Sequence, residues 1–379
     1  MTIRKDNMGF IDRVSIYRSN FRQKTNATRT FNYSFKGING SSTKGTTINT
    51  LKAALGEHIE RVSLYKNIKN LTEKEVTAYN LLKDKIEQIP NKFVSLTVMD
   101  DIYFDNEAEK NNYYNDSSGV GSHLSSNLAL KSSFFEFVER QSLVFSFLTE
   151  SPALEVLFHE IENNQLINKL NRYFDEVKFY DISIIKGIYV IIGIGFGTKY
   201  YGIGLSANSN LFDALLGAVE ELVQCIWAFL PKEYTNYGYS KKIKDVHYNE
   251  IDEIDEGILK NPHFYSNIFF KFIDSNFLRK AFSYLASNKS TVLQKRTVDV
   301  NFNPIYVAKK FAKKFNINLY IINIPAANID YKNKVVKFFS PECYPHINNL
   351  LIEPEKFKIS YIKNSQQKFP NKHKYLPFP

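Results

Sequence analysis

Two stretches of the chain place pairs of glutamates three residues apart among apolar neighbours. The first, "KAALGEHIERVSLYK", contains Glu57 and Glu60, and the second, "KSSFFEFVERQ", contains Glu136 and Glu139. In both, an arginine follows the second glutamate, so each stretch has the pattern Glu-x-x-Glu-Arg. Residues three apart lie on one face of a helix, where two bare carboxylates repel each other, and burial increases that cost. The pattern therefore predicts two helices whose glutamates need a cation.

A third stretch, "GAVEELVQCIW", offers a variation, with Glu221 and Gln224 again three apart. If all three helices face a common centre, Mg²⁺ suits that centre, because it prefers carboxylate oxygens and usually binds together with phosphates. Arg61 and Arg140 would supply positive charge to a phosphate or hold the glutamates in place. The residues thus indicate a carboxylate-lined site for Mg²⁺ and a polyphosphate.

Two other interpretations of the same residues need consideration. Glu57 and Arg61, like Glu136 and Arg140, are four residues apart, which is the ordinary ion-pair spacing of a solvated helix face, and the sequence leaves this alternative open. A di-iron carboxylate bundle would need Glu-x-x-His on its helices. His58 directly follows Glu57 and so points elsewhere, and the other two stretches contain no histidine. We therefore do not expect iron.

Small residues precede two of the expected helices, in "SSTKGTT" (41–47) and "DSSGVGSH" (116–123). Such segments let backbone amides approach a phosphate, with Lys44 assisting, although Ser/Gly loops also simply cap helices. The glycines of "GIGFG" (193–197) do not form a dinucleotide fingerprint, because their spacing is wrong and no helix follows at once.

Composition narrows the class of protein. An apolar content of 44% over 379 residues excludes a disordered chain. The net charge of +10 owes six lysines to 356–379, which contains no Asp or Glu, and without that stretch it is +4 (10 − 6). Because no zinc-finger spacing, RNP-like motif or basic helix is found, we expect no nucleic-acid partner. Cys225 and Cys343 are too few for a disulfide scaffold or a cysteine zinc site.

The N-terminus, "MTIRKDNMGF", lacks the apolar core of a signal peptide, and no apolar run approaches the ~20 residues that span a bilayer. We therefore expect a cytoplasmic protein with no membrane partner.

The elements that must position these residues alternate without a strict βαβ period, which predicts an α+β fold of mixed sheets with packed helices. We expect one domain over 1–379, with 1–43 as an N-terminal segment and 356–379 as a basic tail that ends in proline. The predicted helices cover about 48–65, 73–88, 127–148, 153–173, 210–229, 276–287 and 304–315, a polar loop covers 105–122, and the predicted strands are 92–104, "EVKFYDISI", "GIYVIIGIGF", "KYYGIGLSA" and 317–324.

Three blocks in this order, "KAALGEHIER", "SSFFEFVERQSL" and "ANSNLFDALLGAVEELVQC", resemble the YcaO superfamily, whose ATP-binding core is described by glutamate-bearing helices of this kind. The ending "LPFP" adds a second resemblance, to the cyclodehydratase members that finish in a proline-rich C-terminus. Within the superfamily the chain is similar to the stand-alone azoline-forming subunits of microcin-type thiazole/oxazole synthases. The resemblance covers about 44–224 and the last residues, and nothing is recognised between about 230 and 370.

The resemblance implies a YcaO-like ATP-binding fold with ATP and Mg²⁺ as cofactors, in which carboxylates hold the metal ions that bridge the ATP phosphates. It also implies that the C-terminus, with its carboxylate, stands beside the reacting amide. By position, the metal ligands, which also bind the nucleotide, are Glu57, Glu60, Glu136, Glu139 and Glu221; the further nucleotide-binding residues are Lys44, Gly45, Arg140 and Gln224; the residues beside the amide are Pro377, Phe378 and Pro379.

The implied activity is that of an ATP-dependent cyclodehydratase, which converts Cys, Ser or Thr of a ribosomally synthesised precursor peptide to thiazolines or oxazolines by phosphorylating the backbone amide oxygen. The alternatives are another YcaO-type amide activation, such as thioamide or amidine formation, and a non-catalytic scaffold subunit. The implied partners are the precursor peptide, a ubiquitin-activating-enzyme-like leader-binding subunit and a flavin-dependent azoline dehydrogenase.

The chain departs from the family pattern at five positions. Relatives often have serine at the position of Ala53, asparagine at that of Leu124 and an acidic residue at that of Leu128. They often have a basic residue at the position of Gly217 and proline at that of Tyr375. Leu124, Leu128 and Gly217 favour the scaffold alternative.

Overall fold

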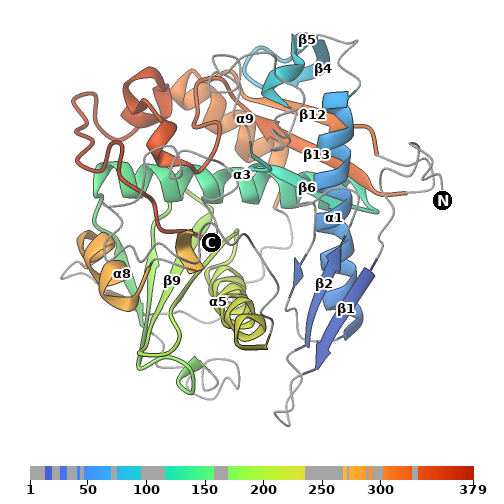
Figure 1. The fold of residues 1–379 in the computed structure, drawn as a ribbon. Helices are drawn as coiled ribbons and strands as arrows, with labels where there is room; N and C mark the ends of the chain where they lie inside the picture. The colour runs from blue at the N-terminus through green and yellow to red at the C-terminus, as the bar shows by residue number, and fades with distance from the viewer. Residues whose placement is uncertain are drawn as a thin grey trace. The chain divides into compact units, whose positions relative to one another are not determined.

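The computed structural model describes residues 13–18, 26–31, 41–42, 47–69, 75–94, 116–157, 170–234, 268–270, 273–286, 290–292, 302–326 and 332–379 (Figure 1). The chain divides into two compact units. The first contains residues 1–141, 300–347 and 355–367, and the second contains 142–299, 348–354 and 368–379.

The first unit holds two antiparallel sheets, of which the larger has the strand order β5-β4-β12-β13-β6 and the smaller the order β1-β2-β3. Helix α1 contacts β2, β3 and β6. The larger sheet comprises β4 (Glu75–Asn80), β5 (Lys85–Pro90), β6 (Val120–His123), β12 (Tyr320–Ile324) and β13 (Lys334–Phe339); the smaller comprises β1 (Arg13–Arg18), β2 (Asn26–Phe31) and β3 (Ser41–Ser42); the helices are α1 (Thr47–Lys69), α9 (Pro304–Phe315), the 3₁₀ turn η1 (Asn91–Phe93) and α3 (Ser126–Thr149) as far as residue 141.

The second unit holds one sheet of order β10-β9-β8-β7-β11, antiparallel except for the parallel pair β7 and β11. Its strands are β7 (Leu154–Leu157), β8 (Glu176–Asp181), β9 (Tyr189–Phe196), β10 (Gly202–Asn208) and β11 (Ser290–Val292); its helices include α5 (Leu211–Tyr234), α8 (Ser275–Ala281), η4 (Ser283–Leu285) and η5 (Asn349–Leu351). The short helices η6 (Pro354–Lys356) and η7 (Lys358–Tyr361) follow later in the chain.

The long helices and the three-strand run β8, β9 and β10 confirm the sequence prediction, as does the α+β class. The predicted ends of α9 are also confirmed. Asn303 caps its N-terminus by accepting a hydrogen bond from the amide of Tyr306, Pro304 occupies the first turn, and Asn316 ends the helix in the left-handed conformation.

The helix predicted over 73–88 is wrong, because this segment forms the hairpin β4–β5. The side chain of Asn80 accepts hydrogen bonds from the amides of Leu82 and Lys83, which favours a turn, and Asp84 adopts a left-handed backbone. Lys83 and Glu87 have the spacing of a helical ion pair and do pair at 3.0 Å, but Lys83 lies in the turn and Glu87 on β5. Their four-residue spacing therefore does not indicate a helix here.

Other predictions also fail where pairing with distant segments decides the structure. Residues 154–157, predicted helical, form β7 because they pair with β8 and β11, and residues 171–173 form a turn; 158–169 lie outside the described residues. The strand predicted over 92–104 begins instead with η1, and 95–104 is not described. Part of the predicted polar loop, 120–122, belongs to β6, which pairs with β13.

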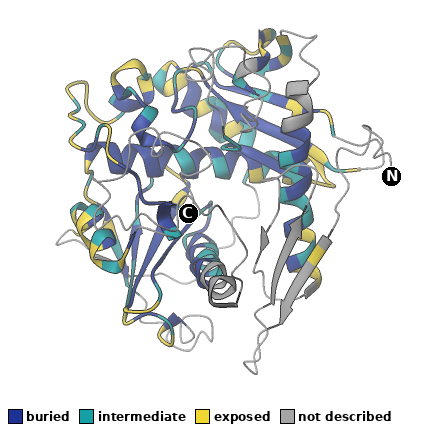
Figure 2. Ribbon diagram, in the orientation of Figure 1, coloured by how far each residue is buried: buried dark blue, intermediate teal, exposed yellow. Residues whose placement is uncertain are grey.

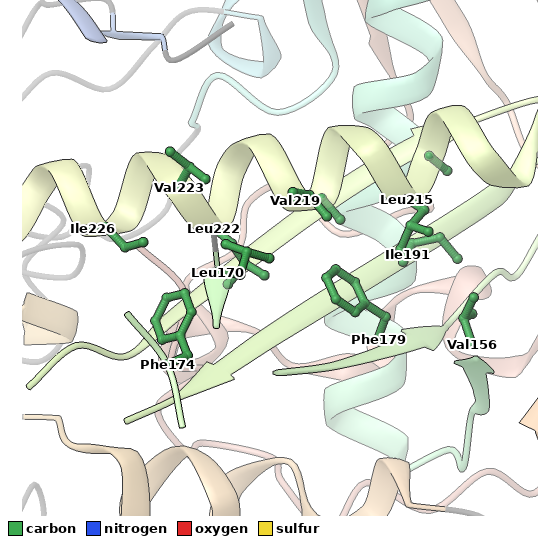
Figure 3. Packing of buried hydrophobic residues seen from close by; sticks show 12 residues of the cluster. Val156, Leu170, Phe174, Phe179, Ile191, Leu215, Val219, Leu222, Val223 and Ile226 are labelled. Atoms are coloured by element: carbon green, nitrogen blue, oxygen red, sulfur yellow. The ribbon is translucent and has the colours of Figure 1, made fainter. Parts of the chain in front are cut away.

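The core of the second unit lies between α5 and its sheet. Figure 3 shows Leu215, Val219 and Leu222 of α5 directed at Phe179 and Ile191 of the strands. The helix lies directly on the backbone of β10, because a Cβ added at Gly204 would stand 1.9 Å from the carbonyl oxygen of Ala218. Hence the glycines of these strands serve packing.

The basic C-terminal stretch is folded onto the protein. Lys358 pairs with Glu342 at 2.5 Å, and Lys372 pairs with Glu353 at 2.6 Å.

Figure 2 shows that α3 is buried along most of its length. In the described part of the chain, no helix has the length and apolar character needed to cross a bilayer.

Candidate functional site

Helices α1 and α3 carry the two Glu-x-x-Glu-Arg motifs, and both motifs lie in the first unit. Helix α3 is fixed by Ser133, whose buried hydroxyl donates to the carbonyl of Gly119 at 2.7 Å and accepts from the amide of Phe338 at 3.1 Å. Strand β6 approaches α3 closely at Gly121, where a Cβ would lie 2.5 Å from the amide nitrogen of Ser133. The strand between the two helices is thereby held in place.

Glu60 on α1 is tied to this strand. Its Oε1 accepts a hydrogen bond from the amide of Ser122 at 2.6 Å. Burial raises the pKa of Glu60 well above its ordinary value, and the charges of Glu136 and Glu57 raise it further, against the Ser122 hydrogen bond and Arg61. Glutamates from both motifs therefore act on one another electrostatically.

Glu136 on α3 has the same character. Burial raises its pKa to about 8; Arg140 opposes this rise, whereas Asp116 and Glu57 add to it. We call Glu57, Glu60, Asp116 and Glu136 the acidic cluster. The raised pKa values mean that Glu60 and Glu136 hold their protons more tightly than an ordinary glutamate, because both are buried and lie near other carboxyls.

The arginines of the two motifs pair with their own helices. Arg61 Nη2 lies 2.5 Å from Glu57 Oε1, and Arg140 Nε lies 3.6 Å from Glu139 Oε1. The first pair has the four-residue spacing of the solvated-face alternative, but its side chains are only 30% and 28% exposed. Because both arginines also lower the pKa of Glu136, they belong to the electrostatics of the acidic cluster rather than to a remote surface.

The structure adds three residues that the sequence did not single out. Asp116 accepts hydrogen bonds from the amides of Ser118 at 2.8 Å and Ile347 at 3.0 Å. Lys337 is 2% exposed, and its Nζ donates to the Asp116 carbonyl at 3.1 Å. Burial lowers the pKa of Lys337 to about 8 and that of His346 to about 4. The negative charge of Asp116 opposes both decreases, and that of Glu136 also opposes the decrease at Lys337. The one sequence signal for Asp116 was its place at the start of the segment 116–123.

Glu221 and Gln224 lie on α5, which belongs to the second unit together with β10. Glu221 Oε2 accepts a hydrogen bond from the amide of Leu205 at 3.0 Å. Gly217, where relatives carry a basic residue, faces Ser206: a Cβ would lie 2.2 Å from its Oγ. The close helix–strand contact therefore explains this departure from the family pattern.

The remaining predicted residues fall in three places. Glu139 is buried on α3, and Leu124 and Leu128 near the start of that helix are 69% and 47% exposed. The terminal residues 377–378 are buried in the second unit. Lys44 and Gly45 lie outside the described residues.

The acidic cluster fits Mg²⁺ bound together with phosphates. Within the described ranges, no three Asp, Glu, His or Cys side chains form a ready-made metal site. Mg²⁺ seldom uses such an all-protein cage, since it commonly binds one or two carboxylates, water and substrate phosphates. The raised pKa values of Glu60 and Glu136 show buried carboxyls whose ionised form a cation would stabilise.

Fold and site thus define an α+β protein with a partly buried acidic cluster suited to Mg²⁺ and a polyphosphate. Residues 76–307, more than half of the chain, match the family model described as "YcaO cyclodehydratase, ATP-ad Mg2+-binding". The chain therefore belongs to the YcaO family, which confirms the resemblance, and its cofactors are ATP and Mg²⁺.

Individual relatives agree with this family. The microcin B17-processing protein McbD of Escherichia coli is 25% identical over 254 residues, which cover 54% of this chain and 62% of that protein, less than two thirds of its length. A chain of the E. coli microcin synthetase McbBCD complex with pro-MccB17 bound superposes with a TM-score of 0.70 at 19% identity, covering 97% of this chain and 96% of that one. YcaO from Methanopyrus kandleri, bound with AMPPCP and Mg2+, has a TM-score of 0.64 at 12% identity, covering 92% and 89%. The structural likenesses show a shared fold.

Proposed function

We propose that this chain is the ATP-dependent subunit that forms azolines in a ribosomally synthesised precursor peptide. Cys, Ser or Thr side chains would become thiazolines or oxazolines. The observation that carries this proposal is the acidic cluster, in which α1 and α3 bring carboxyls so close that Glu57 raises the pKa of both Glu60 and Glu136. The likeness to McbD, a microcin-processing protein, supports a peptide substrate.

The reaction needs a poor leaving group to become a good one. The Cys, Ser or Thr side chain adds to the preceding carbonyl carbon and gives up its proton, and the former carbonyl oxygen becomes a hydroxyl. That oxygen then takes the γ-phosphoryl group of ATP, which leaves as ADP. Loss of phosphate, together with the proton of the amide nitrogen, leaves a C=N bond in the ring. The net change in the peptide is the loss of one water for each ATP hydrolysed.

The proposed roles of this chain's residues are those that the family resemblance implies. Glu57, Glu60, Glu136, Glu139 and Glu221 are the proposed metal ligands, and Mg²⁺ bound there would neutralise the charge that develops on the phosphates. Arg140, Gln224, Lys44 and Gly45 are the proposed nucleotide contacts. The terminal residues Pro377, Phe378 and Pro379 would lie beside the reacting amide.

Partner subunits complete the proposal. The McbBCD chain that superposes on this one functions in a complex, and its structure holds pro-MccB17. We propose that this chain likewise works with a leader-binding subunit that resembles ubiquitin-activating enzymes and with a flavin-dependent azoline dehydrogenase. The precursor peptide would be held by the leader-binding subunit during the reaction.

The test mixes the purified chain, its partner subunits, the precursor peptide and Mg·ATP, and follows the peptide by mass spectrometry. We expect the loss of one water per modified residue. Glu136→Gln should abolish this change, whereas Glu75→Gln, which alters an exposed carboxylate of β4 in the same unit, should leave it intact.

The other outcomes separate the alternatives. A gain of sulfur in place of oxygen, without the loss of water, would show thioamide formation instead. Amidine formation by an amine of the same peptide also releases one water, so fragmentation of the product must show whether the amine nitrogen or a Cys, Ser or Thr side chain has joined the former carbonyl carbon. An unchanged peptide mass, with tight binding of Mg·ATP, would show a scaffold subunit.

A further inference from the structure

The approach of the chain to its C-terminus is held at several points within the second unit. Asn349, fully buried, donates from Nδ2 to the carbonyls of Asn371 at 2.7 Å and Lys374 at 3.0 Å. Asn371 in turn donates from Nδ2 to the carbonyl of Phe147 at 3.0 Å. These bonds fix the main chain up to residue 374, because each joins it to a buried part of the unit.

Beyond residue 374 the chain is held by a side chain. Tyr375 is 4% exposed, and its hydroxyl hydrogen-bonds to the backbone of Phe269, which is fully buried. The carbonyl of the same Phe269 accepts a hydrogen bond from the hydroxyl of Tyr201 at 2.8 Å. Two tyrosines from distant parts of the chain therefore bond to one residue of the short helical segment 268–270.

The contact between these groups is close throughout. The rings of Tyr201 and Phe269 have their centroids 5.5 Å apart. Leu376 and Phe378 are 0% and 4% exposed, so the residues on either side of Pro377 are held in apolar surroundings. The Tyr375 hydroxyl is thus a polar anchor at the start of a buried apolar end.

We infer that Tyr375 is a positioning residue, which aims Pro377–Pro379 through its bond to the Phe269 backbone. This inference rests on the proposed function, in which the chain end lies beside the reacting amide. Pro377 is two residues from Tyr375, a reach of at most about 7 Å, so the anchor limits where the end can lie. At this position the family resemblance predicts proline, whose ring restrains the backbone; here a hydrogen bond supplies the restraint.

The test compares two variants that each remove one hydroxyl from the same bonded group. Tyr375→Phe removes the anchor of the chain end, and Tyr201→Phe removes the other hydroxyl bonded to Phe269 while leaving the end untouched. In the reconstituted complex, Tyr375→Phe should lower kcat about tenfold, the effect of one hydrogen bond, with the KM for ATP unchanged. Tyr201→Phe should change kcat less than about twofold, although both variants lower Tm similarly.

Several results would overturn the inference. It fails if Tyr375→Phe keeps wild-type kcat, or if Tyr201→Phe loses as much, because an equal loss indicates a merely structural bond. It also fails if Tyr375→Phe loses Mg·ATP binding together with turnover, since a positioning defect leaves nucleotide binding intact. Deletion of 377–379 distinguishes a failure of the proposed function from a failure of this inference. If the deletion variant is fully active, the proposed role of the chain end is refuted. If it is inactive while Tyr375→Phe is fully active, only the positioning role of Tyr375 is refuted.

Discussion

Both units fix a glutamate by the same device but place it in different surroundings. In the first unit Glu60 accepts a hydrogen bond from the amide of Ser122 on β6, and in the second Glu221 accepts one from the amide of Leu205 on β10. A glycine directly precedes the donor in both strands: Gly204 allows α5, which carries Glu221, to approach β10, whereas Gly121 allows α3, and not the helix of Glu60, to approach β6. One carboxylate oxygen of each glutamate is therefore oriented by a strand.

The difference lies in what else surrounds the glutamate. Around Glu60 lie the other carboxyls of the acidic cluster, and burial raises the pKa of Glu60 and that of Glu136. Around Glu221 the helix packs through the apolar side chains Leu215, Val219 and Leu222. The carboxyls around Glu60 stay together although they repel one another, whereas the packing of the helix around Glu221 is stabilised by the hydrophobic effect. This contrast supports the proposal that the acidic cluster binds a ligand, because a structural role does not require charges that oppose one another.

The largest expected effect comes from breaking the helix–strand contact of the second unit. In Gly204→Ala the new Cβ would meet the backbone of Ala218 at 1.9 Å, so α5 must shift, at a cost of about 3 kcal/mol in the free energy of unfolding. The control is Gly56→Ala on α1, where the nearest atom lies at 3.9 Å, and this change should add up to about 1 kcal/mol. Urea unfolding measures both; equal stabilities would contradict this view of the α5 contact.

The next effect is a pH dependence that belongs to the first unit. Because the pKa of Glu136 is about 8 when folded and 4.5 ordinarily, the folded chain binds more protons between these values. Stability should therefore be greatest near pH 5 and fall by roughly 2 kcal/mol as pH rises to 8. Thermal unfolding without Mg²⁺ measures this change, and Glu136→Gln should remove most of it. A wild-type stability that rises over this range would contradict the pKa assignment.

A smaller effect is expected on nucleotide binding when one charge of the acidic cluster is removed. Glu60→Gln keeps an oxygen acceptor for the Ser122 amide but loses the charge, so the chain should stay folded while the Kd for Mg·ATP rises about tenfold, or ~1.4 kcal/mol. Without Mg²⁺ at pH 8 this variant should be slightly more stable than wild type. Isothermal titration with Glu75→Gln as control decides; unaltered affinity would exclude Glu60 from the site.

The smallest effect sharpens the contrast between the units. Glu221→Gln also keeps its acceptor, for the Leu205 amide, on a helix that packs through apolar side chains. We therefore expect a slight loss of stability, about 0.5 kcal/mol, because a charged hydrogen bond becomes neutral. Opposite signs for Glu60→Gln and Glu221→Gln at pH 8 would support the comparison. A gain in both would show that Glu221 is crowded too.

The sequence predicted most of the long elements because their apolar periodicity is local. Helices α1, α3, α5 and α9 and the strands β8, β9 and β10 were found for this reason. The hairpin β4–β5 was missed because it depends on a turn in which Asn80 accepts hydrogen bonds from two amides, and β6 and β13 were missed because their pairing with each other joins distant segments.

Contacts between distant segments also limited how much of the candidate site the sequence could predict. The Glu-x-x-Glu-Arg repetition identified Glu57, Glu60 and Glu136, since two helices with one rare motif indicate a shared role. Lys337 could not be found, because a lysine in the strand "KVVKFF" carries no local sign that it is buried against the Asp116 carbonyl. The anchor at Tyr375 likewise depends on Phe269, more than a hundred residues away in sequence.

The most direct measurement is the number of protons released when Mg·ATP binds at pH 7, obtained by calorimetry in two buffers of different ionisation enthalpy. If the buried carboxyls of the first unit hold the metal, they must ionise on binding, so the wild type should release protons and Glu136→Gln should release fewer. Glu75→Gln should match the wild type. Tight binding with no proton release, or with equal release by Glu136→Gln, would contradict a metal site at these glutamates.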